Sequence, residues 1–113
     1  MDELWQNERS FWLEGIDFFE TQLARECLMV LPGMGILDRT QVVESLRNAP
    51  RWSEIEMQVR REAMIGTSVA LLAYNAVGHR DHAPLYRATC TSAYVLEDHR
   101  RWRMVQHQQT PAS

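Results

Sequence analysis

Hydrophobic side chains recur three and four positions apart near the start of the chain, which is the spacing of an amphipathic helix. The segment 2–15 has this pattern, and its acidic residues Asp2 and Glu3 favour the beginning of a helix. The positions at this spacing form one aromatic-rich face: Leu4, Trp5, Glu8, Phe11, Trp12, Gly15 and Ile16. A second, short helix is expected over 17–23. The apolar run 26–31, closed by Pro32-Gly33, predicts a strand and a turn.

The middle of the chain predicts one more helix, and the remainder predicts strands. Asp38 can cap this helix, and Gln41 three residues later forms a variant of the capping box. Pro50 stops the helix near residue 48. Polar and apolar residues alternate over 55–65, so this strand is expected to have one wet face and one buried face. Three further strands are expected over 68–77, which is apolar on both faces, 85–97 and 102–109.

Helices segregated from a run of strands with short connections indicate an α+β fold. Strands of about eleven residues would be about 36 Å long, and strands of that length bend or coil. We therefore expect a cone-shaped, curved antiparallel sheet wrapped around the N-terminal helices, in a single domain spanning 1–113.

Composition narrows the function classes. The chain has 113 residues and a formal net charge of -3, which gives no electrostatic reason to expect nucleic acid as a partner. It has no apolar run long enough for a membrane span and no signal segment, so we expect a cytoplasmic protein that does not bind membranes. All 12 basic residues are arginine, which excludes a Schiff-base lysine mechanism.

Two long segments resemble the nuclear transport factor 2-like superfamily, in particular its small bacterial SnoaL-like and domain-of-unknown-function branch. They are PGMGILDRTQVVESL followed by RW, and the ending YRATCTSAYVLEDHRRWRMVQHQQTP. The resemblance implies a curved sheet closed by helices around a pocket. The superfamily contains isomerases, cyclases, hydrolases, dehydratases and binding or assembly domains, so the fold alone does not select a function.

The isomerase and cyclase members remove a proton next to a carbonyl, which needs a base in an apolar cavity and a donor to the oxyanion. No acidic residue occurs in 68–77, in 85–96 or in 102–109, where these patterns place a carboxylate. This departure favours binding over catalysis. The best remaining base is His107, with Tyr74 as a donor. The alternative for His107 is a histidine bonded within the sheet or facing a partner subunit.

Other polar and aromatic residues are candidates for lining a pocket. Buried in an apolar strand, Asn75 would need partners, and a ligand can supply them. Aromatic walls suit a flat apolar ligand, although core packing is the alternative for every aromatic residue. Of three glutamines in the last strand, Gln106 and Gln108 are assigned to the site and Gln109 is considered with them. The ligand-binding candidates are Trp12, Trp52, Asn75, Tyr86, Tyr94, Gln106 and Gln108.

Several residues are expected to have no special chemistry. The loop segment 79–82 has two histidines but no metal-ligand spacing, so we expect no metal site and no cofactor. Cys27 and Cys90 are expected to be buried, unreactive thiols.

Three functions stay open. The favoured one is a pocket protein that binds a small apolar or carbonyl-bearing ligand. The first alternative is an isomerase, cyclase or dehydratase that uses His107 with a tyrosine donor. The second is a dimerisation module, because superfamily members pair through the sheet and a strand apolar on both faces suits burial of both.

Overall fold

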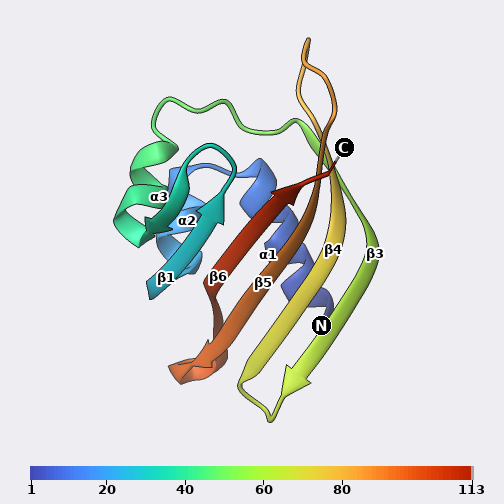
Figure 1. Cartoon of the computed structure of the whole chain (residues 1–113). Helices are drawn as coiled ribbons and strands as arrows, with labels where there is room; N and C mark the ends of the chain where they lie inside the picture. Colours follow the sequence, from blue (N-terminus) through green and yellow to red (C-terminus); the bar gives the residue numbers. More distant parts are fainter. Residues whose placement is uncertain (113) are drawn as a thin grey trace.

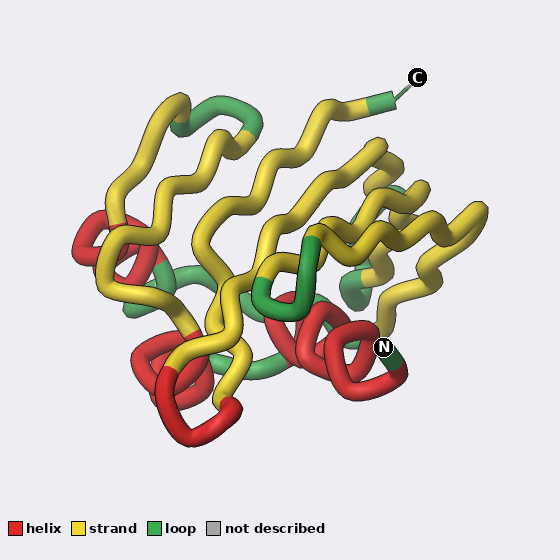
Figure 2. Tube along the Cα trace, turned by 90° about the horizontal axis from the view of Figure 1, so that it is seen from below, coloured by secondary structure: helices red, strands yellow, loops and turns green. Residues whose placement is uncertain are grey.

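The strands form one curved sheet, and the helices lie against one of its faces. A computed structural model of the chain describes residues 1–112, apart from the side chain of His99. In the view of Figure 2, the strands arch over the helices, so the molecule has one layer of sheet and one of helices. The α+β prediction and the curved sheet around the N-terminal helices are confirmed.

The helices and strands follow the predicted order with one addition (Figure 1). The sheet order is β2-β1-β6-β5-β4-β3. The elements are α1 (Asp2–Leu13), α2 (Ile16–Gln22), β1 (Leu23–Leu31), β2 (Gly35–Asp38), α3 (Arg39–Ser45), β3 (Glu54–Ile65), β4 (Val69–His79), β5 (Tyr86–Glu97), a 3₁₀ turn (Asp98–Arg100) and β6 (Arg101–Pro111).

The added element is β2, which pairs antiparallel with β1. The turn between them needs two residues with positive φ, and Gly33 (75°) and Gly35 (78°) supply them. The predicted capping box of α3 is confirmed, because the side chains of Asp38 and Gln41 each accept the other's backbone N–H at 2.9 Å.

The predicted antiparallel sheet contains one parallel pair, since β1 runs parallel to β6. Parallel neighbours need a long crossover connection, and the two strands lie near opposite ends of the chain. This pairing places β6 in the sheet interior, between β1 and β5, where its inner face meets the helices (Figure 1).

A bulge in β3 changes which residues lie on its two faces, so the predicted pattern is wrong beyond the bulge. The register with β4 shifts between Gln58 and Arg61, and Val59 lies within the shift at φ 52°. Ile55 and Met57 are buried as predicted, but beyond the bulge the inward positions change parity. Ala63 and Ile65 were expected on the buried face and are exposed, as is Val59, whereas Glu62 accepts a hydrogen bond from the Trp5 indole at 3.1 Å.

A second bulge decides which residues of β6 face the helices. The register with β5 shifts between Ala93 and Tyr94, which leaves Val105 unpaired on the β6 side. Met104 and His107 are therefore both buried although they are three positions apart. The prediction that β4 is buried on both faces holds only in part, because Leu71 is 40% exposed on the outer face.

Candidate functional site

A pocket of about 340 Å³ opens between the helices and the inner face of the sheet. Its walls come from α1, α2, α3, β1 and β6, and from the segment 46–52 that leads from α3 to β3. Figure 1 shows this segment, in green, crossing from α3 to β3 past one end of the sheet. The apolar lining includes Phe11, Trp12, Phe19, Met29, Val42, Trp52 and Met104, and the polar lining includes Arg51, Arg80, Tyr86, His107 and Gln109.

Behind this pocket lies a carboxylate that is fully buried. Glu8 projects from α1 with no exposed surface. Its Oε2 accepts hydrogen bonds from the hydroxyls of Tyr74 at 2.5 Å and Ser92 at 2.7 Å, and its Oε1 accepts one from Tyr94 at 2.6 Å. The Nδ1 of His107 lies 3.4 Å from Oε2. We refer to these five residues as the Glu8 cluster.

The donors of the Glu8 cluster keep its carboxylate charged. Burial alone raises the pKa of Glu8, but the hydrogen bond from His107, the charge that His107 carries when protonated, and the two tyrosine hydroxyls outweigh burial and lower the pKa. Burial and the nearby charge of Glu8 raise the pKa values of Tyr74 and Tyr94 well above 10.0. The tyrosines therefore stay protonated and donate, and Glu8 stays ionised and accepts.

A chain of hydrogen bonds, which we call the relay, joins the pocket to Glu8. The Tyr86 hydroxyl donates to Gln109 Oε1 at 2.9 Å, and Gln109 Nε2 lies 3.1 Å from His107 Nε2. On its other side, His107 Nδ1 lies 2.7 Å from Ser92 Oγ, whose hydroxyl donates to Glu8.

The donor directions are mutually consistent if His107 carries its proton on Nδ1. Ser92 has one hydroxyl proton, which Glu8 accepts, so Ser92 accepts the Nδ1–H of His107. Gln109 accepts from Tyr86 through its oxygen, so its amide N–H donates to His107 Nε2. In this arrangement His107 Nε2 lies on the pocket side, where it accepts from Gln109, and the Glu8 carboxylate lies on the core side.

Aromatic rings form the wall beside the relay. Trp52 stacks on Tyr86 with centroids 5.2 Å apart, and Trp12 meets Trp52 edge to face at 5.7 Å. The Trp12 indole donates to the Tyr74 hydroxyl at 2.9 Å, which ties this wall to the Glu8 cluster. Gly78 lets the Trp52 ring lie close to β4, because a Cβ at this position would be 2.9 Å from the ring.

The structure brings four of the candidate residues to the pocket: Trp12, Trp52, Tyr86 and His107. Tyr74 and Tyr94 lie behind it, with their hydroxyls bonded to Glu8. These two residues hold the carboxylate and are not among the residues that line the cavity.

Three candidates lie away from the pocket, and their expected placement is corrected. Asn75 is exposed on the outer face, where its side-chain oxygen accepts from Thr89 at 3.1 Å. Gln106 and Gln108 alternate with His107 and so also face outward. The bulge at Val105 sets this parity, and it gives the inward place to Gln109.

Sequence reasoning missed Glu8, because the search for a carboxylate covered only the strands. The available signal was a glutamate within the apolar stripe of the first helix, four positions from Leu4 and Trp12. The absence of acidic residues from 68–77, 85–96 and 102–109 is correct, but the helix supplies the carboxylate instead.

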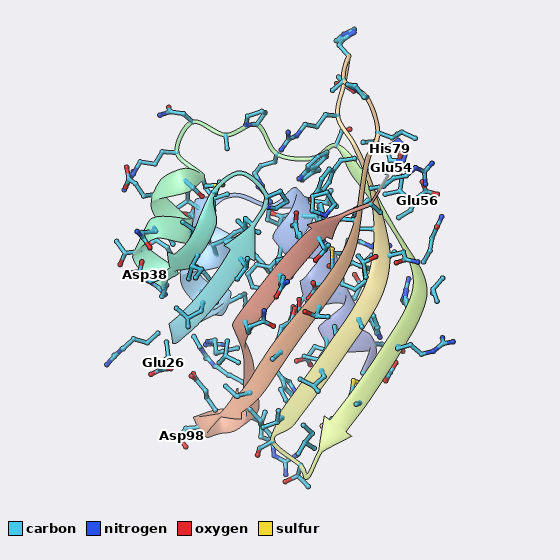
Figure 3. All side chains as sticks on the ribbon, in the orientation of Figure 1. Glu26, Asp38, Glu54, Glu56, His79 and Asp98 are labelled. Atoms are coloured by element: carbon cyan, nitrogen blue, oxygen red, sulfur yellow. The ribbon has the colours of Figure 1, made fainter. Side chains whose placement is uncertain are left out.

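Outside the pocket, one histidine has an acidic neighbour. His79 Nε2 lies 2.9 Å from Glu56 Oε2, and Figure 3 shows both near Glu54, at the same end of β3 and β4. Glu26, Asp38 and Asp98 lie at the margins of the molecule in the same view. Within residues 1–112 no three metal-binding side chains gather into a possible ion site. Burial raises the pKa of Cys27 and of Cys90 to about 12, so both thiols stay protonated.

None of the helices in the described part of the chain combines the length and the apolar composition needed to cross a bilayer.

No protein-family model and no curated protein sequence matches the chain. Solved structures do match over nearly its whole length. An NTF2-like protein of unknown function from Pseudomonas aeruginosa is 24% identical, with a TM-score of 0.78 and coverage of 99% of this chain and 97% of that one. An NTF2-like protein of unknown function in nutrient uptake from Rhodospirillum rubrum is 18% identical, with a TM-score of 0.82 and coverage of 96% and 94%.

A third similar structure is an association domain. The association domain of C. elegans CaMKII is 12% identical, with a TM-score of 0.78 and coverage of 96% of this chain and 90% of that one. At these identities the comparisons establish the fold and leave the function open. The chain has the nuclear transport factor 2-like fold, as its sequence resemblance implied.

Proposed function

We propose that the chain binds a small, largely apolar molecule in the 340 Å³ pocket and hydrogen-bonds its polar group to Gln109 and Tyr86, beside the ring of His107. The carrying observation is the relay, which presents these three polar groups on one side of an otherwise largely apolar cavity. Apolar pockets with a few convergent polar groups are the usual form of small-molecule sites.

The Glu8 cluster supports this proposal because it fixes the orientation of the relay. Glu8 accepts from three hydroxyls and attracts His107, so the imidazole cannot rotate without breaking a buried contact. A ligand then meets a preorganised site, which reduces the entropy lost on binding.

Binding can be tested with 1-naphthamide, a flat neutral probe with one polar group, followed by calorimetry and by the fluorescence of Trp12 and Trp52. Wild type is expected to bind it. Leu46→Trp, which places a ring in the pocket lining, is expected to abolish binding. Leu71→Trp, on the outer face, is the matched control and is expected to leave binding unchanged. Equal binding by both variants would place the ligand elsewhere and contradict the proposal.

A second function is favoured by one observation, the contact between His107 and ionised Glu8. In this alternative the Gln109 side chain moves away, His107 Nε2 removes a proton from a carbon next to the ligand carbonyl, and Glu8 stabilises the imidazolium that forms. The donor to the resulting enolate oxygen is Tyr86, because it lines the pocket and Tyr74 does not, and its hydroxyl exchanges Gln109 for the enolate.

Proton removal can be measured as deuterium uptake by 2-tetralone, a bicyclic ketone, in D₂O. The alternative predicts uptake about a hundredfold above buffer, lost in His107→Ala and retained in Gln108→Ala, which changes an exposed neighbour. An unchanged rate in folded His107→Ala would remove the enzymatic alternative while leaving the binding proposal in place.

We also propose that the chain pairs as a homodimer through the outer face of the sheet. Leu28, Val30 and Ile36 are exposed by 52%, 36% and 74%, and Val30 and Ile36 lie opposite each other in register. A patch of this kind suits a partner surface. Light scattering is expected to give twice the chain mass for wild type and the chain mass for Ile36→Asp. A wild-type monomer at micromolar concentration would contradict this proposal.

A further inference from the structure

Two arginines contribute to the pocket, and neither is paired with an acid. Arg51 and Arg80 both lie in its lining. Among the described residues no carboxylate oxygen lies within 4.0 Å of either guanidinium. Among the other described arginines, only Arg47 and Arg103 have an acidic partner, Glu44 at 2.8 Å and Glu97 at 3.9 Å. Arg51 and Arg80 are distinguished by the place of their unpaired charge, which is the lining of a largely apolar pocket. The pocket therefore holds positive charge that the protein itself leaves without an anion.

Arg51 is held in place by the end of α1. Its Nε donates to the carbonyl of Glu14 at 2.7 Å, and its Nη2 donates to those of Phe11 and Trp12 at 2.5 and 2.8 Å. These bonds satisfy carbonyls that have no partner within the helix, where a cation is favourable. Nη1 has no acceptor among the described residues, so it is the nitrogen that can still donate to a ligand.

Arg80 is held differently, by an aromatic ring. Its guanidinium lies 3.7 Å from the centroid of Trp52, which in turn stacks on Tyr86. Its Nε is buried and has no hydrogen-bond partner among the described residues. A buried donor without a partner is unfavourable, and a ligand acceptor reached by a small rotation of the guanidinium would satisfy it.

The two guanidinium groups influence each other. Burial and the charge of Arg80 lower the pKa of Arg51 to about 10, so Arg51 is still cationic at neutral pH. Two like charges near each other are unfavourable without a counter-charge, and a ligand anion would provide it.

We propose that the pocket prefers an anionic ligand, a flat aromatic or alicyclic carboxylate whose charged group binds between Arg51 and Arg80 while its ring lies against Trp52 and Tyr86. A planar carboxylate matches the fork of donors that a guanidinium presents. This inference rests on the proposed binding function and adds the chemical class of the ligand.

The test compares 1-naphthoate with 1-naphthamide, which has nearly the same shape without the charge. Calorimetry on wild type is expected to give at least tenfold tighter binding of 1-naphthoate, because a carboxylate accepts charge-assisted hydrogen bonds that a neutral amide does not match. Arg80→Gln is expected to remove this preference by weakening the binding of 1-naphthoate much more than that of 1-naphthamide, and the remaining binding of 1-naphthamide shows that the pocket is intact.

Arg87→Gln is the matched control, because Arg87 is exposed on β5, alternates with the pocket residue Tyr86, and its loss changes net charge equally. It is expected to retain the preference. Equal binding of both probes by wild type, or a preference that persists in Arg80→Gln, would overturn the anion inference and leave the binding proposal standing. Failure of wild type to bind either probe at millimolar concentration would overturn both.

Discussion

The Glu8 cluster and the two arginines of the pocket use their polar groups in opposite ways. In the cluster, three hydroxyls and an imidazole converge on one carboxylate, and every one of these groups has a partner. In the pocket, neither arginine has an acidic partner among the described residues, and Arg80 Nε has no acceptor among them. A saturated network stabilises the fold, whereas open donors are available to a ligand.

The largest effect on stability is expected from breaking the hydrogen-bond network of the Glu8 cluster. Glu8→Gln replaces an oxygen that accepts two hydroxyls by an amide that must donate, so it is expected to lower the free energy of unfolding at pH 7 by about 3–5 kcal/mol. Urea denaturation measures the change. Glu3→Gln, an exposed change on the same helix, is the control and is expected to cost a few tenths of a kcal/mol. A Glu8→Gln variant as stable as this control would show that the cluster does not anchor the fold.

The same cluster predicts how stability depends on pH. Because the pKa of Glu8 is lower in the folded chain than its ordinary value of 4.5, its contribution is present above that value and is lost as the pH falls through the folded pKa. As the pH falls below 5, the Tm of wild type is therefore expected to decrease more than the Tm of Glu8→Gln. Parallel pH profiles for the two proteins would contradict the assignment of an ionised Glu8.

An intermediate effect on stability is expected where the Trp52 ring packs against Gly78 of β4. A methyl group at Gly78 would lie 2.9 Å from the Trp52 ring, so Gly78→Ala is expected to displace that ring and cost about 1–3 kcal/mol. Near-ultraviolet circular dichroism is expected to report the change in tryptophan packing. An unchanged spectrum would mean that Trp52 does not rest on β4. Gly15→Ala, with open space around the added Cβ, is the control.

The smallest effect on stability, but a specific one on binding, is expected in β6. Gln109→Ala removes the side chain between Tyr86 and His107 and is expected to weaken 1-naphthamide binding several-fold. Gln108→Ala removes an exposed neighbour and is expected to change neither stability nor binding. Equal effects of the two variants would show that the bulge at Val105 does not set the binding face.

The order of helices and strands could be predicted because it depends on local patterns. The stripe in α1, the capping box at Asp38 and the long strands all follow from residues within a few positions of one another. The face of each strand could not be predicted beyond a bulge, as the exposure of Ile65 and the inward place of Gln109 demonstrate.

The candidate site was predictable in part for the same reason. His107, Trp12, Trp52 and Tyr86 could be selected by residue type, and the structure places them on the pocket. The partners of Glu8 come from three strands and lie 66 to 99 positions further along the chain, so no local pattern reveals them. Arg51 and Arg80 likewise meet only through the folding of the segment 46–52 against β4 and its following loop.

We propose that the relay presents His107, Gln109 and Tyr86 to a bound small molecule while the Glu8 cluster stays intact behind them. Nuclear magnetic resonance of labelled protein during titration with 1-naphthamide tests this arrangement. Signals of the imidazole nitrogens of His107 and of the side-chain amide of Gln109 are expected to change, and those of the outward residues Asn75 and Gln108 are expected to stay unaffected. Changes confined to the outer face, with His107 and Gln109 unaltered, would contradict it.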